Sequence, residues 1–211
     1  QTGDRRLVLA GYLTRDDIWD EFRAAWAHEL SSPPALDSLH MVEAANFRGP
    51  LKHWSEAQRD AKVAALARLV SAYQLFSFEC TVSVSIHREM FGDDLPHGFA
   101  KPYNACAQGA VITLARYVYE LGGREPIQFV FDTQQGAAED IIALWTWMKQ
   151  AGREPWRKLL GPLPRFADDQ DEAPLQAADM LAWHRRRAIE SAEAIEARPI
   201  MAQLLSSPHL M

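Results

Sequence analysis

The chain has 211 residues and a mass of 23.8 kDa, which is enough to bury a substantial core in one domain. Its residues are 48% hydrophobic and 24% charged, as in a globular protein, and no apolar run approaches the ~18 residues of a membrane helix. The net charge of −6 argues against a surface that coats nucleic acid broadly, although a local basic patch can still contact phosphates. Two cysteines without metal-ligand spacing favour a reduced, cytoplasmic protein.

The first predicted elements are a strand and a helix. Residues 7–13 are apolar and β-prone, and Thr14 with Asp17 resembles a capping box that starts a helix. The helix is expected to end at the Ser-Ser-Pro-Pro sequence of residues 31–34. Its apolar residues recur at helical spacing and form one stripe: Trp19, Phe22, Trp26 and Leu30.

A second capping box, Ser55 with Gln58, predicts the start of the next helix. The apolar row of this helix is Val63, Leu66, Val70 and Tyr73. A strand is then predicted over 78–87, because apolar and polar residues alternate there and alternation indicates one buried face. The residues expected on that face are Phe78, Cys80, Val82, Val84 and Ile86.

Helices and strands alternate in the rest of the chain. Asn104 is expected to cap a helix that Gly122 and Gly123 close, and the apolar run 127–131 is typical of a strand buried on both faces. The further elements expected are a helix over 137–150, a short strand around 163–168, a last helix over 174–187 and a loosely specified tail over 198–211. Together the elements predict a single α/β domain, a mixed sheet flanked by helices. Because the sequence starts at Gln1, we also expect that the native N-terminal strand has been lost.

Asp132 directly follows the apolar run 127–131. Functional groups in open α/β sheets gather outside the carboxyl ends of the strands, so Asp132 is a candidate site residue. The alternative is that Asp132 only starts the turn that leads to the next helix.

Asp179 lies in a predicted helical row with Leu175 and Trp183, which are both apolar. A carboxylate among apolar groups must be paired, protonated or bound to a cation. Gln176, one turn earlier, is expected to hydrogen-bond the carboxylate and orient it. The alternative is that Asp179 sits at the edge of the apolar row and meets an arginine.

Asp132 and Asp179 together suggest a metal site. If the last helix packs near the end of the Asp132 strand, the two carboxylates repel unless a divalent cation lies between them. Oxygen ligands suit magnesium or manganese, and two such ions can hydrolyse a phosphodiester. Glu43 is the candidate third acid, because it follows His40 by three residues and both can share one helix face. A structural hydrogen bond is the other explanation for this His-x-x-Glu pair.

Three consecutive arginines, Arg185, Arg186 and Arg187, are candidates for contact with the phosphates of a nucleic acid. The alternative is a solvated helix end whose positive charge favours the negative end of the helix dipole.

Several segments resemble the bacterial family called domain of unknown function 3800, which is similar to the ribonuclease H fold. The resemblance spans nearly the whole chain and is carried by GDRRLVLAGYL, LHMVEA, FVFD and above all PLQAADMLAW. It implies a ribonuclease H-like fold with Asp132 as the acid of the middle strand and Asp179 as the acid of the last helix. The family's first strand carries Asp-Glu-Ser-Gly, and in this chain that motif would precede Gln1. Asp4 lies after the place where the motif belongs.

Two functions are therefore expected. The first is a magnesium- or manganese-dependent phosphodiesterase acting on nucleic acid, with Asp132, Asp179 and Glu43 as catalytic residues and with Gln176 and His40 supporting them. The second is a non-catalytic binding or interaction module with an incomplete acidic site. Seven tryptophans are more than a core of this size needs, so an aromatic interface, such as that of a homodimer, is a further expectation.

Overall fold

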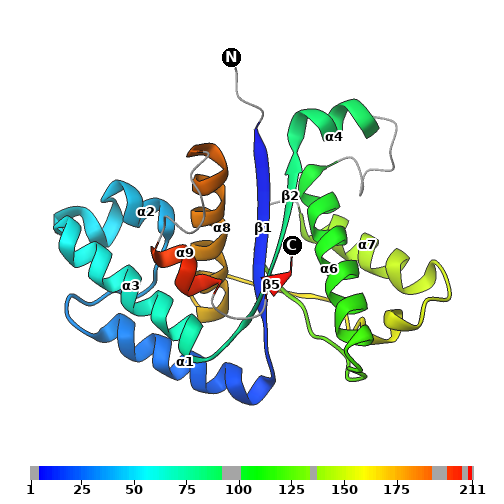
Figure 1. The fold of residues 1–211 in the computed structure, drawn as a ribbon, viewed down its shortest axis with the longest axis horizontal. Helices are drawn as coiled ribbons and strands as arrows, with labels where there is room; N and C mark the ends of the chain where they lie inside the picture. Colours follow the sequence, from blue (N-terminus) through cyan, green and yellow to red (C-terminus); the bar gives the residue numbers. More distant parts are fainter. Residues whose placement is uncertain (1–4, 92–100, 134–136, 192–198, 206–208, 211) are drawn as a thin grey trace. The chain divides into compact units, whose positions relative to one another are not determined.

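A computed structural model describes residues 5–91, 101–133, 137–191, 199–205 and 209–210. The chain is mixed α/β, as predicted, and it forms two compact units (Figure 1). The first unit comprises Gln1–Leu9 and Glu79–Ala167, and the second comprises Ala10–Phe78 and Asp168–Met211. Strands β1 (Arg6–Leu13) and β2 (Phe76–Ser83) each contribute residues to both units.

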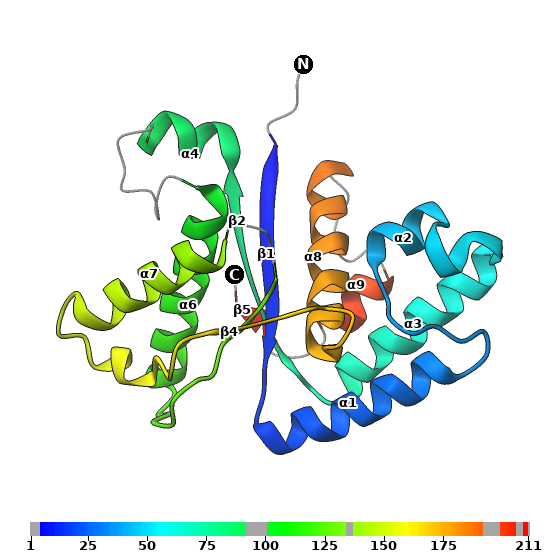
Figure 2. The ribbon, with the colours of Figure 1, turned by 180° about the vertical axis from the view of Figure 1, so that it is seen from behind.

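The second unit is mainly helical. Its helices are α1 (Asp16–Ser31), α2 (Met41–Asn46), the 3-10 helix η1 (Gly49–His53), α3 (Glu56–Ala72), α8 (Ala173–Ser191) and α9 (Pro199–Leu204). In Figures 1 and 2, α3 lies beside α1 and α9, and α8 contacts α1, α2, α3 and α9. The apolar faces of these helices form one core, in which Phe22, Leu66 and Met180 are fully buried.

The starts of α1 and α3 test the two predicted capping boxes. The second is confirmed, because Ser55 Oγ accepts a hydrogen bond from Gln58 N at 3.3 Å and Gln58 Oε1 accepts one from Ser55 N at 2.9 Å. The Thr14–Asp17 capping box is wrong. The N-cap of α1 is Arg15, whose guanidinium Nε donates to Asp17 Oδ1 at 3.0 Å, so this carboxylate is already bound. Both predicted apolar stripes face the core: Phe22, Trp26, Leu30, Val63, Leu66 and Val70 are buried.

The predicted strand over 78–87 is partly wrong. Strand β2 ends at Ser83, and Val84–Phe91 forms helix α4. Ser83 Oγ accepts a hydrogen bond from Ile86 N at 3.0 Å, as an N-cap residue does, and this starts the helix although the alternation continues along the sequence. The inward face is also the opposite one, because Ser77 and Glu79 are buried.

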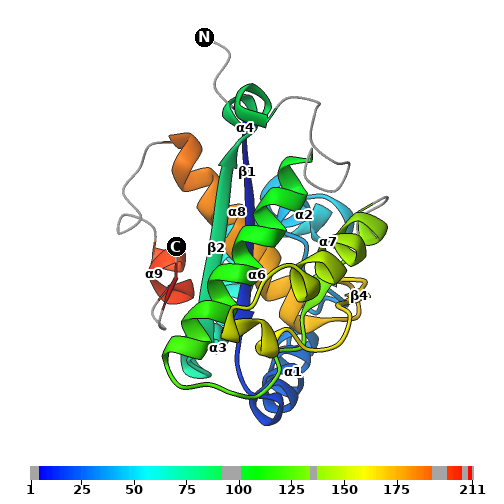
Figure 3. The ribbon, with the colours of Figure 1, turned by 90° about the vertical axis from the view of Figure 1, so that its right-hand side faces the viewer.

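The first unit contains a helical part and a short parallel sheet. Its elements besides α4 are α6 (Pro102–Glu120), β3 (Val130–Asp132), α7 (Ala138–Gln150), the 3-10 helix η2 (Pro155–Leu159) and β4 (Arg165–Ala167). Helix α6 packs against α7 and η2 (Figure 3). Helix α6 ends as predicted before Gly122, whose φ of 91° is in the left-handed region that glycine favours.

The apolar run before Asp132 is buried on one face only. Ile127, Phe129 and Phe131 are buried, whereas Gln128 is exposed and Val130 is half-buried. The run pairs in parallel with the segment around β4, where Arg165 N donates to Phe129 O at 2.9 Å. The prediction of a strand buried on both faces is therefore wrong.

The described strands form two small sheets, where one mixed sheet was expected. One sheet has the order β1-β2-β5, with β5 (His209–Leu210) parallel to β2, and the other pairs β3 with β4. A loosely specified tail was expected over 198–211, and the residues described there form α9 and β5. Met201 and Leu204 of α9 are fully buried, and their burial in the core fixes this segment. Among the described helices, none has the length and apolar character needed to cross a bilayer.

Candidate functional site

Helix α8 carries most of the residues that the sequence singled out, and its buried face differs from the predicted one. The buried residues of α8 are Gln176, Ala177, Met180, Leu181, His184 and Ala188. Leu175, Asp179 and Trp183, the row predicted to face the core, are all half-buried. Asp179 therefore lies at the edge of the buried face, as the alternative for this residue proposed. That alternative also proposed an arginine as its partner.

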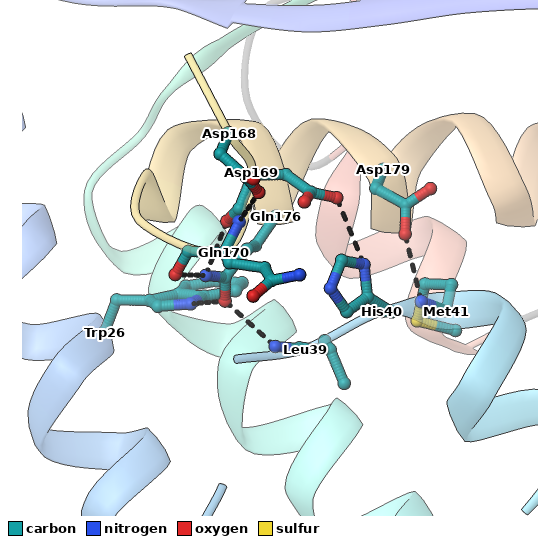
Figure 4. Close-up of polar contacts among 9 residues, drawn as sticks. All are labelled: Trp26, Leu39, His40, Met41, Asp168, Asp169, Gln170, Gln176 and Asp179. Carbon is teal, nitrogen blue, oxygen red and sulfur yellow. Dashed lines mark hydrogen bonds and ion pairs between the residues drawn. The ribbon is translucent and has the colours of Figure 1, made fainter. Parts of the chain in front are cut away.

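Gln176 of α8 makes four side-chain hydrogen bonds, and it lies in the second unit with all four partners (Figure 4). Its Oε1 accepts hydrogen bonds from Trp26 Nε1 at 2.9 Å and from Leu39 N at 3.0 Å. Its Nε2 donates to Asp169 O at 2.8 Å and to Gln170 O at 3.3 Å. The side chain is 2% exposed, so these bonds satisfy a buried amide whose role is architectural. The predicted contact with Asp179 is replaced by contacts with Trp26 and the main chain.

Gln176 binds the main chain at Leu39, and Asp179 binds it two residues later, at Met41. Its Oδ2 accepts a hydrogen bond from Met41 N at 2.9 Å (Figure 4). Met41 is the first residue of α2, and the first N–H groups of a helix have no partner within the helix. A carboxylate at this end also faces the positive end of the helix dipole. The partner of Asp179 is thus a helix start, where the sequence predicted a cation or an arginine.

The His40–Glu43 pair does not act as a unit. His40 is the N-cap residue of α2, and its Nδ1 lies 3.1 Å from Asp169 Oδ2 (Figure 4). Glu43 instead lies against Gly49, where an added Cβ would be 2.8 Å from Glu43 Oε2. Gly49 has a φ of 56°, so both its conformation and the neighbouring carboxylate favour glycine there. The two side chains serve separate local contacts.

Asp132 belongs to the first unit, whereas Asp179 belongs to the second. It ends β3, as predicted, and is half-buried. Burial, and then the charge of Asp132, raises the pKa of Tyr103 to about 12, with a smaller effect from Cys106. Asp132 thus acts on the hydroxyl of Tyr103, a half-buried residue at the start of α6.

The start of α6 differs from the prediction. Its N-cap is Lys101, and Asn104 is the third residue of the helix and is fully buried. Asn104 Nδ2 donates to Asp140 Oδ2 at 3.2 Å, and Lys101 Nζ lies 2.7 Å from the same oxygen. Asn104 therefore links α6 to the first turn of α7, and its predicted role as a helix cap is wrong.

The expected metal site of Asp132, Asp179 and Glu43 stays a prediction, because its acids belong to two different units. Within residues 5–91, 101–133, 137–191, 199–205 and 209–210, no three His, Cys, Asp or Glu side chains are grouped as metal ligands. Asp179 Oδ2 is already bound to Met41 N, which leaves one oxygen of this carboxylate for another partner. A divalent cation needs several oxygen ligands at just over 2 Å. In the second unit, α8 accepts hydrogen bonds from the backbone N–H groups of Leu39 and Met41.

The arginines near the end of α8 surround a cavity of about 420 Å³ in the second unit. Arg186 and Arg187 line it, as does Arg59 of α3, which belongs to no predicted site. Arg185, the remaining member of the triplet, is half-buried outside this lining. Helix α2, whose first residue is bound by Asp179, supplies another part of the wall. Guanidinium groups converge on this cavity, so it can bind an anion.

Comparison with known protein families, curated proteins and solved structures finds no match for this chain.

Proposed function

We propose that this chain is a non-catalytic binding module for an anionic partner. The observation that carries the proposal is the use of α8. Gln176 and Asp179 in its first half bind the main chain at Leu39 and Met41, while its second half supplies arginines to a cavity that α2 also lines. The motif that resembles a catalytic signature thus holds one wall of a basic cavity in position.

The alternative proposal is a magnesium- or manganese-dependent phosphodiesterase with a ribonuclease H-like fold. It is supported by the family resemblance and by the position of Asp132, at the carboxyl end of a strand in a parallel pair. It requires Asp179 to ligate a metal while one of its oxygens accepts a hydrogen bond from Met41.

A nuclease assay separates the two proposals. The full chain is incubated with single- and double-stranded DNA and RNA in magnesium or manganese, beside Asp132→Asn and Asp179→Asn. Asparagine at 179 still offers an oxygen to Met41 N, so this variant removes the charge that a metal needs while keeping the architectural bond. We expect no cleavage above that of a buffer control from the wild-type chain or from either variant.

The contradicting result is metal-dependent cleavage by the wild-type chain that either substitution abolishes. A matched control is Asp171→Asn, which changes the same charge at an exposed position before α8. Binding is measured separately, by titrating the chain with a fluorescent phosphate-bearing oligonucleotide or a small organic phosphate. If every anion tested fails to bind, the proposed binding function is overturned.

A further inference from the structure

The cavity of the second unit has the size of a small-molecule site. Its volume of about 420 Å³ falls within the ~300–1,000 Å³ typical of ligand pockets. Its walls come from α2, α3, α8 and α9, so residues far apart in the sequence meet there. An occupant of this space contacts several rigid helices at once.

The charges on the cavity wall favour an anion. Arg59, Arg186 and Arg187 face two acids of the lining, Asp60 and Glu190. Arg59 Nη2 lies 2.8 Å from Asp60 Oδ1, which makes this arginine the best neutralised of the three. Arg186 Nε is 3.8 Å from Glu190 Oε1, which is beyond hydrogen-bonding distance.

Arg187 has the most freely available guanidinium of the cavity. Its Cζ lies 5.6 Å from the ring centre of Trp183, and it forms no ion pair within the part of the chain that the structure describes. Arginine presents five N–H donors in a planar fork that matches the oxygens of a phosphate. Arg186 and Arg187 both line the cavity, so one phosphate group bound there can be reached by both.

The rest of the lining is mostly apolar or aromatic, and its other polar members are Asn46 and His184. Besides Trp183, it includes Val63 of α3 and Ile200 of α9. A bare inorganic ion gains nothing from such a surface, whereas a ligand with a flat, weakly polar body buries area against it. The cavity therefore favours a phosphate joined to a planar group over a phosphate alone.

We propose that this cavity binds a nucleotide-like ligand, whose phosphate monoester lies between Arg186 and Arg187 and whose base lies along the wall that contains Trp183. This inference rests on the proposed function, because it names the chemistry of the anionic partner. The same chemistry has two sources, a free nucleoside monophosphate and the phosphorylated end of a nucleic acid strand.

Isothermal titration calorimetry on the full chain tests the inference with five probes: adenosine monophosphate, adenosine, inorganic phosphate, and a short oligonucleotide with and without a 5′-phosphate. We expect adenosine monophosphate to bind about tenfold or more tightly than adenosine, since a charge-assisted hydrogen bond contributes at least that factor. We expect a similar preference over inorganic phosphate, because only the nucleotide buries a base against the apolar wall. Arg187→Gln should lose about tenfold in affinity. Arg185→Gln, which removes the same charge outside the cavity, should change affinity less than about twofold.

The outcomes distinguish this inference from the proposed function. If inorganic phosphate binds as tightly as adenosine monophosphate, and Arg187→Gln weakens both, anion binding stands and the nucleotide inference is overturned. If no probe binds, both fail. Equal losses for Arg185→Gln and Arg187→Gln overturn the inference, because they indicate attraction by net charge alone. Preference for the phosphorylated oligonucleotide over the monophosphate supports it and identifies the strand end as the source.

Discussion

The two halves of α8 use polar side chains in different ways. In the first half, Gln176 and Asp179 bind groups of the protein itself, and Gln176 makes four hydrogen bonds while almost fully buried. In the second half, Arg186 and Arg187 are exposed and line a cavity. A cluster of polar residues on one helix can therefore combine an architectural part and a binding part. Substitutions in the first half should change stability, and those in the second half should change binding.

The largest expected effect is that of Gln176→Leu. It leaves Trp26 Nε1 and Leu39 N without their acceptor, and each unsatisfied buried donor costs about 1–3 kcal/mol. We expect the free energy of unfolding, measured by urea denaturation, to fall by about 3 kcal/mol or more. Gln170→Leu is the matched control, because its side chain is exposed while its carbonyl remains in place. A loss below about 1 kcal/mol for Gln176→Leu would contradict the architectural role.

Asp179→Ala should have the next largest effect. It removes the acceptor for the first N–H group of α2, and the loss of such a bond at a helix start typically costs about 0.5–2 kcal/mol. Asp179→Asn keeps an acceptor oxygen and should cost less than the alanine variant. Because α2 lines the cavity, ligand affinity should also fall in Asp179→Ala. If Asp179→Asn is more stable than the wild type, repulsion between carboxylates is the better explanation of this residue.

In the first unit, the charge of Asp132 contributes to the raised pKa of Tyr103. Because the pKa of Tyr103 in the folded chain is about 12, above its ordinary value of 10, the folded state keeps this proton longer than the unfolded state. The stability that Tyr103 contributes is complete below pH 10 and is lost as the pH rises from about 10 to 12. In Asp132→Asn the pKa of Tyr103 should fall yet stay above 10, since burial is the larger cause.

The titration of Tyr103 is followed by the ultraviolet absorbance of tyrosinate, with Tyr103→Phe identifying its share of the signal. An unchanged titration in Asp132→Asn would show that the carboxylate does not act on this hydroxyl. Glu120→Gln, which changes an exposed acid at the other end of α6, is a control for loss of charge in the same unit.

The smallest effect on stability is expected for Arg186→Gln and Arg187→Gln. Exposed arginines contribute little to stability, so the free energy of unfolding should change by less than about 0.5 kcal/mol. The measurement is urea denaturation of the same protein samples that are used for ligand binding. If either substitution lowers the free energy of unfolding by more than about 1.5 kcal/mol, the second half of α8 also has an architectural role, which contradicts the division proposed for this helix.

Local sequence patterns predicted the elements whose causes are local. The capping box of Ser55 and Gln58 needs only neighbouring residues, and it forms as predicted. The stripes of α1 and α3 follow from helical spacing, and their apolar residues are buried. The strand over 78–87 failed at Ser83, because a serine that can cap a helix also fits the polar positions of an alternating strand.

By itself the sequence determined that α8 is a helix, that Gln176 and Asp179 need partners, and that an arginine triplet stands near its end. Only the tertiary structure decided which partners they have. Leu39 and Met41 lie far from α8 in the chain and meet it through their backbone N–H groups, which every residue except proline carries and which therefore leave no signal in the sequence. Arg59 is far from Arg186 and Arg187 in the sequence. The packing of α3 against α8 brings the three arginines around one cavity.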